Sequence, residues 1–311
     1  MRVLVTGASG WIGSGLVPEL IAAGHEVIGL ARSDDAAAAV AALGAKVHRG
    51  SLDDLDGLRT AAESADGVAH LAFRHDLAFT GDMAGAAAAD GHAIKVLGEA
   101  LAGSDRPLVI ASGVLGIAPG RVATERDAAE AAESTDAPLE GAGDRMANAH
   151  YTASLASRGV RSSVLRLPPT CHGDGDNGFM AMLVGVARDK GVSGYVGDGS
   201  ARWPATHRLD VARAFRLALE KAPAGSTLHA VAEEGVPGRA FAEVIGRKLD
   251  IPVVPVSPDD AVGHFGFLGF VLPIDSPASS VRTREVLGWE PTHPGLLEDL
   301  GEDHYYALPG D

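Results

Sequence analysis

The sequence contains little that would suit an exported or membrane-embedded protein. It has a single cysteine, Cys171, so no disulfide can form within the chain. No stretch approaches the 18 uninterrupted apolar residues that a membrane-spanning helix needs. Residues 1–12 lack the basic start, apolar run and small-residue cleavage site of a signal peptide. We therefore expect an intracellular, cytoplasmic protein without a membrane partner.

Positive charge is also scarce, with 26 lysines and arginines against 41 acidic residues and a net charge of −15. This balance argues against nucleic acid as a partner, because the phosphate backbone would be repelled. A phosphorylated ligand would have to be held by cations gathered locally. With 46% hydrophobic residues over 311 positions, the chain can bury a full core. We expect a globular protein that acts on a small molecule.

The most informative segment is a glycine-rich turn that directly follows a strand pattern at Arg2–Thr6. Gly7 lets the chain turn sharply, Gly10 leaves room for a phosphate, and Gly13 lets the next helix approach the sheet. That helix directs free N–H groups toward the phosphate. An ordinary strand-to-helix turn is the alternative, but the flanking strand and helix favour a dinucleotide site. The residues assigned to the cofactor here are Gly7, Ser9, Gly10, Trp11, Ile12 and Gly13.

Strand and helix patterns alternate along the first half of the chain, which is typical of an α/β fold with a doubly wound parallel sheet. Residues 120–143 show no clear period and are predicted to be mostly loop. The predicted strands are Arg2–Thr6, Val27–Leu30, Lys46–His48, Gly67–Ala72, Pro107–Ala111 and Ser162–Leu167. The predicted helices are Ile12–Ala23, Asp35–Leu43, Asp53–Ala65, Ala84–Leu101 and Asp144–Ser157.

Short elements rich in glycine and proline replace this rhythm from Pro168 onward. We therefore predict two lobes. Residues 1–167 and about 205–224 would form a Rossmann-type dinucleotide-binding domain. Residues about 168–204 and 225–311 would form a smaller α/β substrate-binding lobe.

Several motifs, in the same order, resemble the extended short-chain dehydrogenase/reductase superfamily and its NAD-dependent epimerase/dehydratase family. Residues 6–13 carry the pattern T-G-x-x-G-x-x-G. The further matching segments are His70–Ala72, Ala111–Gly113, Leu165–Pro168, Gly197–Gly199 followed by His207 and Asp210, and Leu287–Pro291. The resemblance covers essentially the whole chain and implies the same fold.

The chain departs from this family at the reaction centre, where the family has a tyrosine and, four residues later, a lysine. The lysine lowers the phenol pKa and holds the cofactor ribose. None of the four tyrosines has a lysine at that spacing, and Leu155 follows Tyr151 there. The spacing to the next strand puts the lysine position near Arg145 and the tyrosine position near Gly141. Arg145 could still hold a ribose hydroxyl or a phosphate.

Two residues could replace the tyrosine. Ser112 matches the family's serine or threonine that hydrogen-bonds the substrate carbonyl. His75 follows the fourth strand on the side where the nicotinamide should lie, and histidine exchanges protons near neutral pH. The alternatives are an ordinary strand-end serine and a surface-loop histidine. Glu125 and His150 are weaker candidates.

The end of the second strand indicates the cofactor. An acidic residue there would hold the ribose hydroxyls of NAD, whereas Arg32 and Ser33 would accommodate the extra phosphate of NADP(H). We therefore favour NADP(H) over NAD(H), although a solvated arginine beside two aspartates is the alternative. The resemblance further implies cofactor contacts at Ser51 and Leu52 around the adenine, at Leu71, Ala72 and Phe73 along the middle, and at Pro168 beside the nicotinamide.

The second lobe should supply the substrate contacts, for which the resemblance points to His172, Phe179 and Trp203. Trp203 could instead be a core residue. The apolar segment at 265–271 could line a substrate pocket, although core packing is the more frequent role of such a segment. The twelve histidines are scattered without ligand spacing, so no metal site is predicted.

Three functions fit the sequence. We rank first an NADP(H)-dependent oxidoreductase that acts on a small, fairly apolar carbonyl compound with non-standard proton delivery. A non-enzymatic dinucleotide sensor similar to the NmrA-like regulators comes second, and a non-redox isomerase or cyclase follows closely. The small residues of Ala84–Leu101 would also permit a homodimer.

Overall fold

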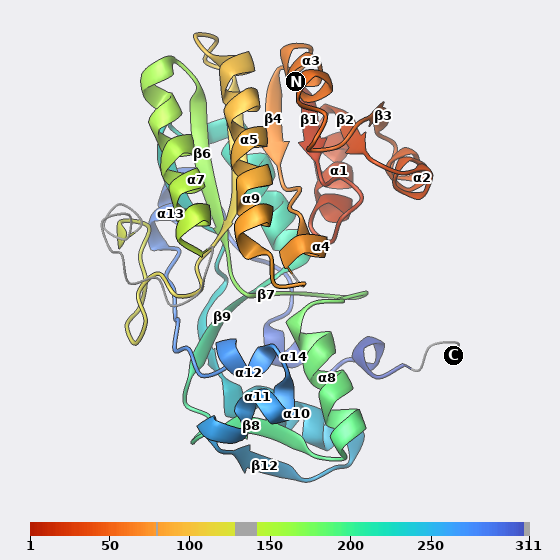
Figure 1. Ribbon diagram of the computed structural model, residues 1–311, viewed down its shortest axis with the longest axis vertical. Coiled ribbons are helices and arrows are strands. Elements are labelled where there is room, and N and C mark those ends of the chain that lie inside the picture. The colour runs from red at the N-terminus through yellow and green to blue at the C-terminus, as the bar shows by residue number, and fades with distance from the viewer. Residues whose placement is uncertain (79, 128–141, 308–311) are drawn as a thin grey trace.

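The computed structural model describes residues 1–78, 80–127 and 142–307. Two lobes of unequal size are stacked along the long axis of the molecule (Figure 1). The larger lobe holds the N-terminus and a parallel sheet, and the smaller lobe holds most of the C-terminal third. The loop predicted at 120–143 lies largely outside the described residues, as does Gly141.

A seven-stranded sheet in the order β10-β6-β5-β4-β1-β2-β3 forms the centre of the larger lobe. Every neighbouring pair in it is parallel. Its strands are β1 (Arg2–Thr6), β2 (Glu26–Ala31), β3 (Lys46–Arg49), β4 (Gly67–His70), β5 (Pro107–Gly113), β6 (Arg161–Leu167) and β10 (Ser226–His229). The carboxyl ends of all seven strands meet at one edge of the sheet.

Helices cover both faces of this sheet, which confirms the predicted doubly wound α/β fold (Figure 1). One face packs against α1 (Gly13–Ala22), α2 (Asp34–Ala42) and α9 (Arg208–Lys221) around a core that includes Leu16 and Phe215. The other face packs against α3 (Leu55–Glu63), α5 (Met83–Leu101) and α7 (Ala142–Ser154) around Leu58, Ile94 and Leu97. A short helix, α4 (His75–Ala78), follows β4.

The smaller lobe has its own core, around Trp203, Phe241 and Phe265. Its mixed three-stranded sheet has the order β11-β9-β7, and a second, parallel pair joins β12 to β8. The strands are β7 (Thr170–His172), β8 (Ser193–Val196), β9 (Arg202–His207), β11 (Glu233–Pro237) and β12 (Val253–Val256). The helices are α8 (Phe179–Lys190), α10 (Gly238–Leu249), α11 (Ala261–Phe265), α12 (Leu268–Val271) and α14 (Leu296–Asp299).

The lobe boundary predicted at residue 225 is wrong for two segments. Strand β10 pairs with β6 and extends the large sheet. Its Leu228 is fully buried in the same core as the neighbouring strands. Helix α13 (Val281–Leu287) packs on α9 and β10, and Trp289 closes that core with no exposed surface. The larger lobe therefore also includes β10 and α13, two segments from the C-terminal third of the chain. No helix in the described part of the chain is long and apolar enough to cross a membrane.

Candidate active site

The glycine turn is built so closely that two of its positions exclude a side chain. Gly7 has a φ of +69°, and a Cβ there would lie 2.8 Å from the backbone nitrogen of Ala72. A Cβ on Gly13 would collide with the carbonyl oxygen of Gly7. Gly10 donates its N–H to that same oxygen at 2.9 Å. The turn therefore exposes backbone where the α1 N-terminus begins, and this shape fits a pyrophosphate.

Trp11 links this turn to the smaller lobe. Its indole Nε1 donates a hydrogen bond of 2.7 Å to the carbonyl oxygen of Cys171, the middle residue of β7. The guanidinium of Arg208 lies 4.4 Å from the centre of the ring, at cation–π distance. The Trp11 side chain thus joins the two lobes. Of this predicted cofactor residue, only the backbone lies in the glycine turn.

A buried polar network lies beneath the turn, where β1 and β4 end. The Thr6 hydroxyl oxygen is 2.7 Å from His70 Nδ1, and His70 Nε2 is 3.1 Å from a carboxylate oxygen of Asp90. Asn148 donates to the second oxygen of Asp90 at 2.9 Å. Asp90 is on α5 and Asn148 is on α7, so the network ties both helices to the sheet.

The directions of these hydrogen bonds follow from their partners. The Thr6 oxygen accepts the N–H groups of Leu71 and Ala72, both at 3.2 Å, so its own proton is directed to His70 Nδ1. His70 then carries its proton on Nε2 and donates it to Asp90. These bonds also end β4 at His70, two residues before the predicted end. Leu71 and Ala72, in the segment predicted to flank the cofactor, are thereby held by their backbone N–H groups.

His75 and Arg145, two of the predicted catalytic residues, meet around Phe73. The Arg145 guanidinium, carried by α7, lies 4.2 Å from the centre of the Phe73 ring. The His75 ring packs edge-on against Phe73, with 5.3 Å between ring centres. The structure thus brings together a base, a cation and an apolar platform from two distant segments of the chain.

Burial and charge set the protonation of this pair. Burial lowers the pKa of His75, and the nearby positive charge of Arg145 lowers it further. Burial also lowers the pKa of the Arg145 guanidinium, while the Asp90 carboxylate opposes that shift. Asp90 therefore acts on both the His70 network and Arg145. Neither Asp90 nor Asn148 was identified from the sequence.

Ser112, the third predicted catalytic residue, lies near the end of β5 and is partly exposed. In the sheet register it is opposite Arg166 of β6, which in turn is opposite His229 of β10. Register partners in a parallel sheet point to the same face, here the one that α7 covers. Arg166 is 1% exposed, and its Nε and Nη1 find no hydrogen-bond partner among the described residues. Burial lowers its pKa to about 10.

Residues at the adenosine end of the predicted cofactor site lie around the ends of β2 and β3. Arg32 is exposed. The Ser33 hydroxyl caps α2 by accepting the Ala36 N–H at 3.2 Å, so it has a structural role in addition to the predicted one. The Ser51 hydroxyl accepts the Asp53 N–H at 3.2 Å. Leu52 is nearly buried in the core beneath α3.

The predicted substrate residues are less accessible than expected. Trp203 is 1% exposed, donates to the Ile274 carbonyl at 3.2 Å and belongs to the core of the smaller lobe, so its assignment to the substrate is wrong. His172 is fully buried and its Nδ1 is 2.9 Å from Asp299, so it cannot contact a substrate as the structure stands. Phe179 is partly buried and packs against Trp203 with 5.6 Å between ring centres.

Other expected positions are also structural. Pro168 is buried, so it offers little surface to a nicotinamide ring. Glu125 is buried and accepts both the N–H and the hydroxyl of Thr283, at 2.8 and 2.7 Å. In residues 1–78, 80–127 and 142–307 no three His, Cys, Asp or Glu side chains are placed to hold a metal ion.

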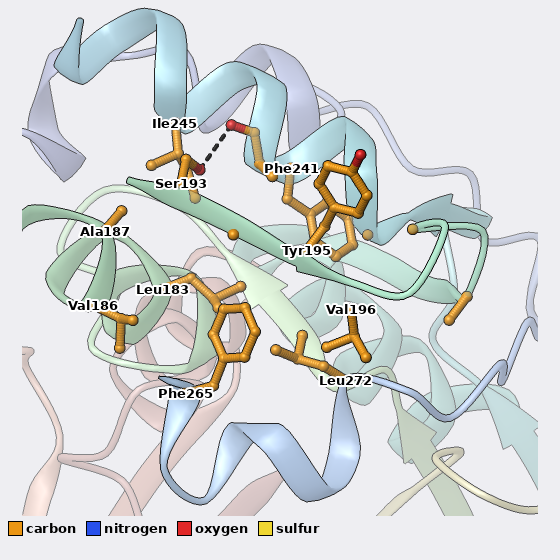
Figure 2. Close-up of a pocket in the computed structure, with 15 residues that line it drawn as sticks. Leu183, Val186, Ala187, Ser193, Tyr195, Val196, Phe241, Ile245, Phe265 and Leu272 are labelled. Carbon is orange, nitrogen blue, oxygen red and sulfur yellow. Dashed lines mark hydrogen bonds between the residues drawn. The ribbon is translucent and has the colours of Figure 1, made fainter. Parts of the chain in front are cut away.

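A small pocket lies within the smaller lobe, away from the glycine turn. Figure 2 shows it between α8, β8, α10 and the α11–α12 segment, with Phe265 and Leu272 on one side and Phe241 on the other. Ser193 at its edge is already bonded to the Ala242 carbonyl at 2.8 Å. Since Phe265 is 5% exposed and lies in the lobe's core, the core role predicted for segment 265–271 holds for this residue.

Comparisons with known proteins agree with this fold. Residues 3–231 match the model of the NAD dependent epimerase/dehydratase family. The chain is 46% identical to Uncharacterized protein C2A9.02 of Schizosaccharomyces pombe, over 98% of this chain and 100% of that one. It is 28% identical to a Stigmatella aurantiaca enzyme, 4-hydroxy-2-methyl-3-oxo-4-farnesyl-3,4-dihydroquinoline-1-oxide ketoreductase, over 86% of this chain and 80% of that one.

Among solved structures, the fold is similar to that of DesIV, a dTDP-glucose 4,6-dehydratase from Streptomyces venezuelae with NAD bound. The TM-score is 0.78 at 19% identity, covering 98% of this chain and 97% of that one. Family and fold together support an enzyme of the NAD(P)-dependent epimerase, dehydratase or reductase type. The sequence motifs, the doubly wound sheet and the glycine turn all lead to one conclusion: the chain belongs to the NAD-dependent epimerase/dehydratase family.

Proposed function

We propose that this protein is an NADP(H)-dependent oxidoreductase that interconverts a ketone and an alcohol on a small, fairly apolar substrate. The observation that carries the proposal is the meeting of His75 and Arg145 around Phe73, beside the carboxyl edge of the sheet. The Stigmatella aurantiaca relative, a ketoreductase by name, has a farnesylated and largely apolar ketone in that name. Its identity of 28% supports the reaction class and leaves the substrate open.

The residues present fit a dinucleotide at the glycine turn, because side chains are excluded at Gly7 and Gly13. A bound nicotinamide cofactor would supply or accept the hydride. The turn would hold the pyrophosphate through backbone N–H groups and the N-terminus of α1. The buried Thr6–His70 network would keep Leu71–Phe73 in place along the cofactor.

Ser112 and His75 would divide the work that a tyrosine performs in related enzymes. The Ser112 hydroxyl would hydrogen-bond the carbonyl oxygen and polarise it. His75 would deliver the proton to that oxygen during reduction, or remove it from the alcohol during oxidation. Arg145 would hold a cofactor hydroxyl, and its positive charge would lower the pKa of His75.

The lowered pKa of His75 implies different pH dependences for reduction and oxidation. Reduction needs the protonated imidazole, and that form is present only below the lowered pKa. Oxidation needs the neutral imidazole, which dominates at and above neutral pH. The rate of ketone reduction should therefore rise on acidification, while alcohol oxidation should be fastest at neutral to mildly alkaline pH.

The test is a titration of purified protein with NADPH and NADH, followed by assays on a panel of apolar ketones and the matching alcohols. Wild type should turn over at least one pair, and His75→Gln should lower kcat by about 10²-fold or more at unchanged cofactor affinity. Ser112→Ala should lower kcat with little effect on NADPH binding. Arg59→Gln, at a partly exposed ion pair with Glu99, is the matched control and should leave both unchanged.

NADPH binding without turnover on any ketone or alcohol would favour the dinucleotide sensor or a non-redox enzyme. Failure to bind either dinucleotide would refute the proposal altogether, since it would remove the glycine turn as a cofactor site.

A further inference from the structure

Arg166 is a buried positive charge that has no counter-charge in the part of the chain that the structure describes. It is the last residue but one of β6 and is 1% exposed, and its Nε and Nη1 have no hydrogen-bond partner there. Burial lowers the pKa of the guanidinium to about 10, and no neighbouring carboxylate of a described residue opposes this shift. The side chain therefore remains charged at neutral pH.

The other arginine of β6 offers a direct comparison. Arg161, at the opposite end of the strand, donates to the carbonyl oxygens of Leu219 and Ala222 at 2.8 and 3.4 Å. A buried charge without such partners is unfavourable for folding, because it loses its hydration and the protein replaces none of it. Arg166 should therefore destabilise the fold, whereas Arg161 should stabilise it.

Ser112 and His229 are the neighbours of Arg166 on the two adjacent strands, β5 and β10. Adjacent strands are about 4.8 Å apart, and residues in register point to the same face. His229 is fully buried, and its Nδ1 donates to the Ser279 carbonyl at 2.9 Å. Burial lowers the pKa of His229 to about 4, and the charge of Arg166 contributes to this shift. At neutral pH, Arg166 is thus the charged member of this row, and Ser112 is its partly exposed end.

We infer that the buried charge of Arg166 makes the position beside Ser112 receptive to a negatively charged oxygen of the substrate. The inference rests on the proposed function, in which Ser112 hydrogen-bonds the substrate carbonyl. When the carbonyl carbon accepts a hydride from reduced nicotinamide, the π electron pair moves to the oxygen, which then takes the proton of His75. A fixed cation one strand away stabilises the charge on that oxygen without touching the substrate, and more strongly in a low-dielectric interior than in water.

This role explains why a destabilising charge is kept at the carboxyl edge of the sheet. The chain has a net charge of −15, so its overall field disfavours a negative oxygen. The hydroxyl of Ser112 is neutral and can polarise the carbonyl without compensating a full charge. Strained or unfavourable groups persist at functional sites where the reaction uses them. Removal of the charge should therefore make the fold more stable and the reaction slower.

The test compares Arg166→Met, which removes the charge, with Arg166→Lys, which keeps it, and with Arg161→Met as the matched control on the same strand. In urea unfolding, the midpoint should move to higher urea for Arg166→Met and to lower urea for Arg161→Met. Arg166→Met should lower kcat for ketone reduction by about tenfold or more at unchanged NADPH affinity, less than the loss on removing a direct donor. Arg166→Lys should restore most of this loss, and Arg161→Met should leave kcat unchanged.

A binding measurement separates the charge from turnover. Benzoate carries negative oxygens and no reducible group, and benzyl alcohol is its neutral counterpart. Calorimetry with and without NADP⁺ gives the dissociation constants of both probes. We expect Arg166→Met to weaken benzoate binding by at least about tenfold and to change benzyl alcohol binding by less than about twofold.

The outcomes separate this inference from the function on which it rests. An Arg166→Met protein less stable than wild type would show that the guanidinium is a structural group, and the inference would be overturned. Benzoate that binds wild type and Arg166→Met equally, or binds neither, would also overturn it, and turnover of a ketone by wild type would leave the proposed function intact. Benzoate binding that depends on Arg166 in a protein that reduces no ketone would refute the proposed function and support the anion-receptive position.

Discussion

Removing the Thr6 hydroxyl tests the buried network on which the predicted cofactor segment rests. Thr6→Val keeps the shape of the side chain and deletes one oxygen. That oxygen accepts the Ala72 N–H, its only partner among the described residues, and donates to His70 Nδ1. Leu71 keeps a second bond, to the Thr6 carbonyl at 3.3 Å.

Two polar groups, the partly buried Ala72 N–H and the buried His70 Nδ1, therefore lose their partner. Each such loss costs about 1–3 kcal/mol, so the free energy of unfolding should fall by about 2–6 kcal/mol. Thr6→Ser, which keeps the hydroxyl, should fall by less than about 1.5 kcal/mol. The measurement is urea unfolding followed by far-ultraviolet circular dichroism at pH 7.

The matched control is Thr60→Val on α3, whose hydroxyl bonds the Asp56 carbonyl at an exposed position. It should change stability by no more than about 0.5 kcal/mol. A Thr6→Val protein as stable as this control would show that water replaces the hydroxyl and that the network does not fix Leu71–Phe73. Cofactor affinity should fall together with stability in Thr6→Val, whereas in the control it should not.

Three further expectations concern other parts of the molecule. Gly29→Ala should lower the free energy of unfolding by about 1–3 kcal/mol, because the new Cβ would be 2.5 Å from a methyl group of Val40; equal stability in urea unfolding would show that the core yields there. Burial lowers the pKa of His229 to about 4, so below pH 6.5 the unfolded state binds a proton that the native state does not. Wild type should lose about 2 kcal/mol more than His229→Asn between pH 7 and pH 5, and parallel pH profiles would refute this. Trp11→Phe removes the bond to the Cys171 carbonyl and should weaken NADPH binding by about tenfold or less with the fold intact; unchanged binding would show that the link between the lobes does not support the turn.

Local sequence patterns were enough to predict the parallel sheet and the glycine turn. Most strands of the larger lobe up to β6 are short apolar runs, whereas β3 (Lys46–Arg49) is mostly polar and exposed. The turn at Gly7–Gly13 depends only on neighbouring residues. The end of β4 was placed two residues too late, because the Thr6 hydroxyl takes the N–H groups that would have continued the strand. Periodicity does not report such a side-chain acceptor.

The candidate site could be predicted only in part, because its contacts join segments that are far apart in the sequence. His75 and Arg145 could be proposed one at a time, but their meeting around Phe73 depends on how α7 packs on the sheet. Asp90 is a single charged residue on a helix, without a local signal. Its role arises from a partner 20 residues away, His70.

Long-range packing also determined two features that local sequence patterns did not predict. These are the buried position of Trp203 and the pairing of β10 with the large sheet. A tryptophan next to a proline fits both a pocket and a core, and only the surrounding smaller-lobe residues decide between them. The segment Ser226–His229 is four residues long and lies after the change in rhythm at Pro168. Its pairing with β6 is a contact between segments about 60 residues apart, which no local pattern encodes.

The place of Trp11 gives the protein an internal optical probe. Two of the three tryptophans, Trp203 and Trp289, are sealed in the cores of the two lobes and should emit at short wavelength whatever the state of the cofactor site. Trp11 alone is partly exposed, under the guanidinium of Arg208 and within the turn that would receive the pyrophosphate. Emission excited at the red edge of the indole band should therefore report on that turn and on its link to the smaller lobe, without any label.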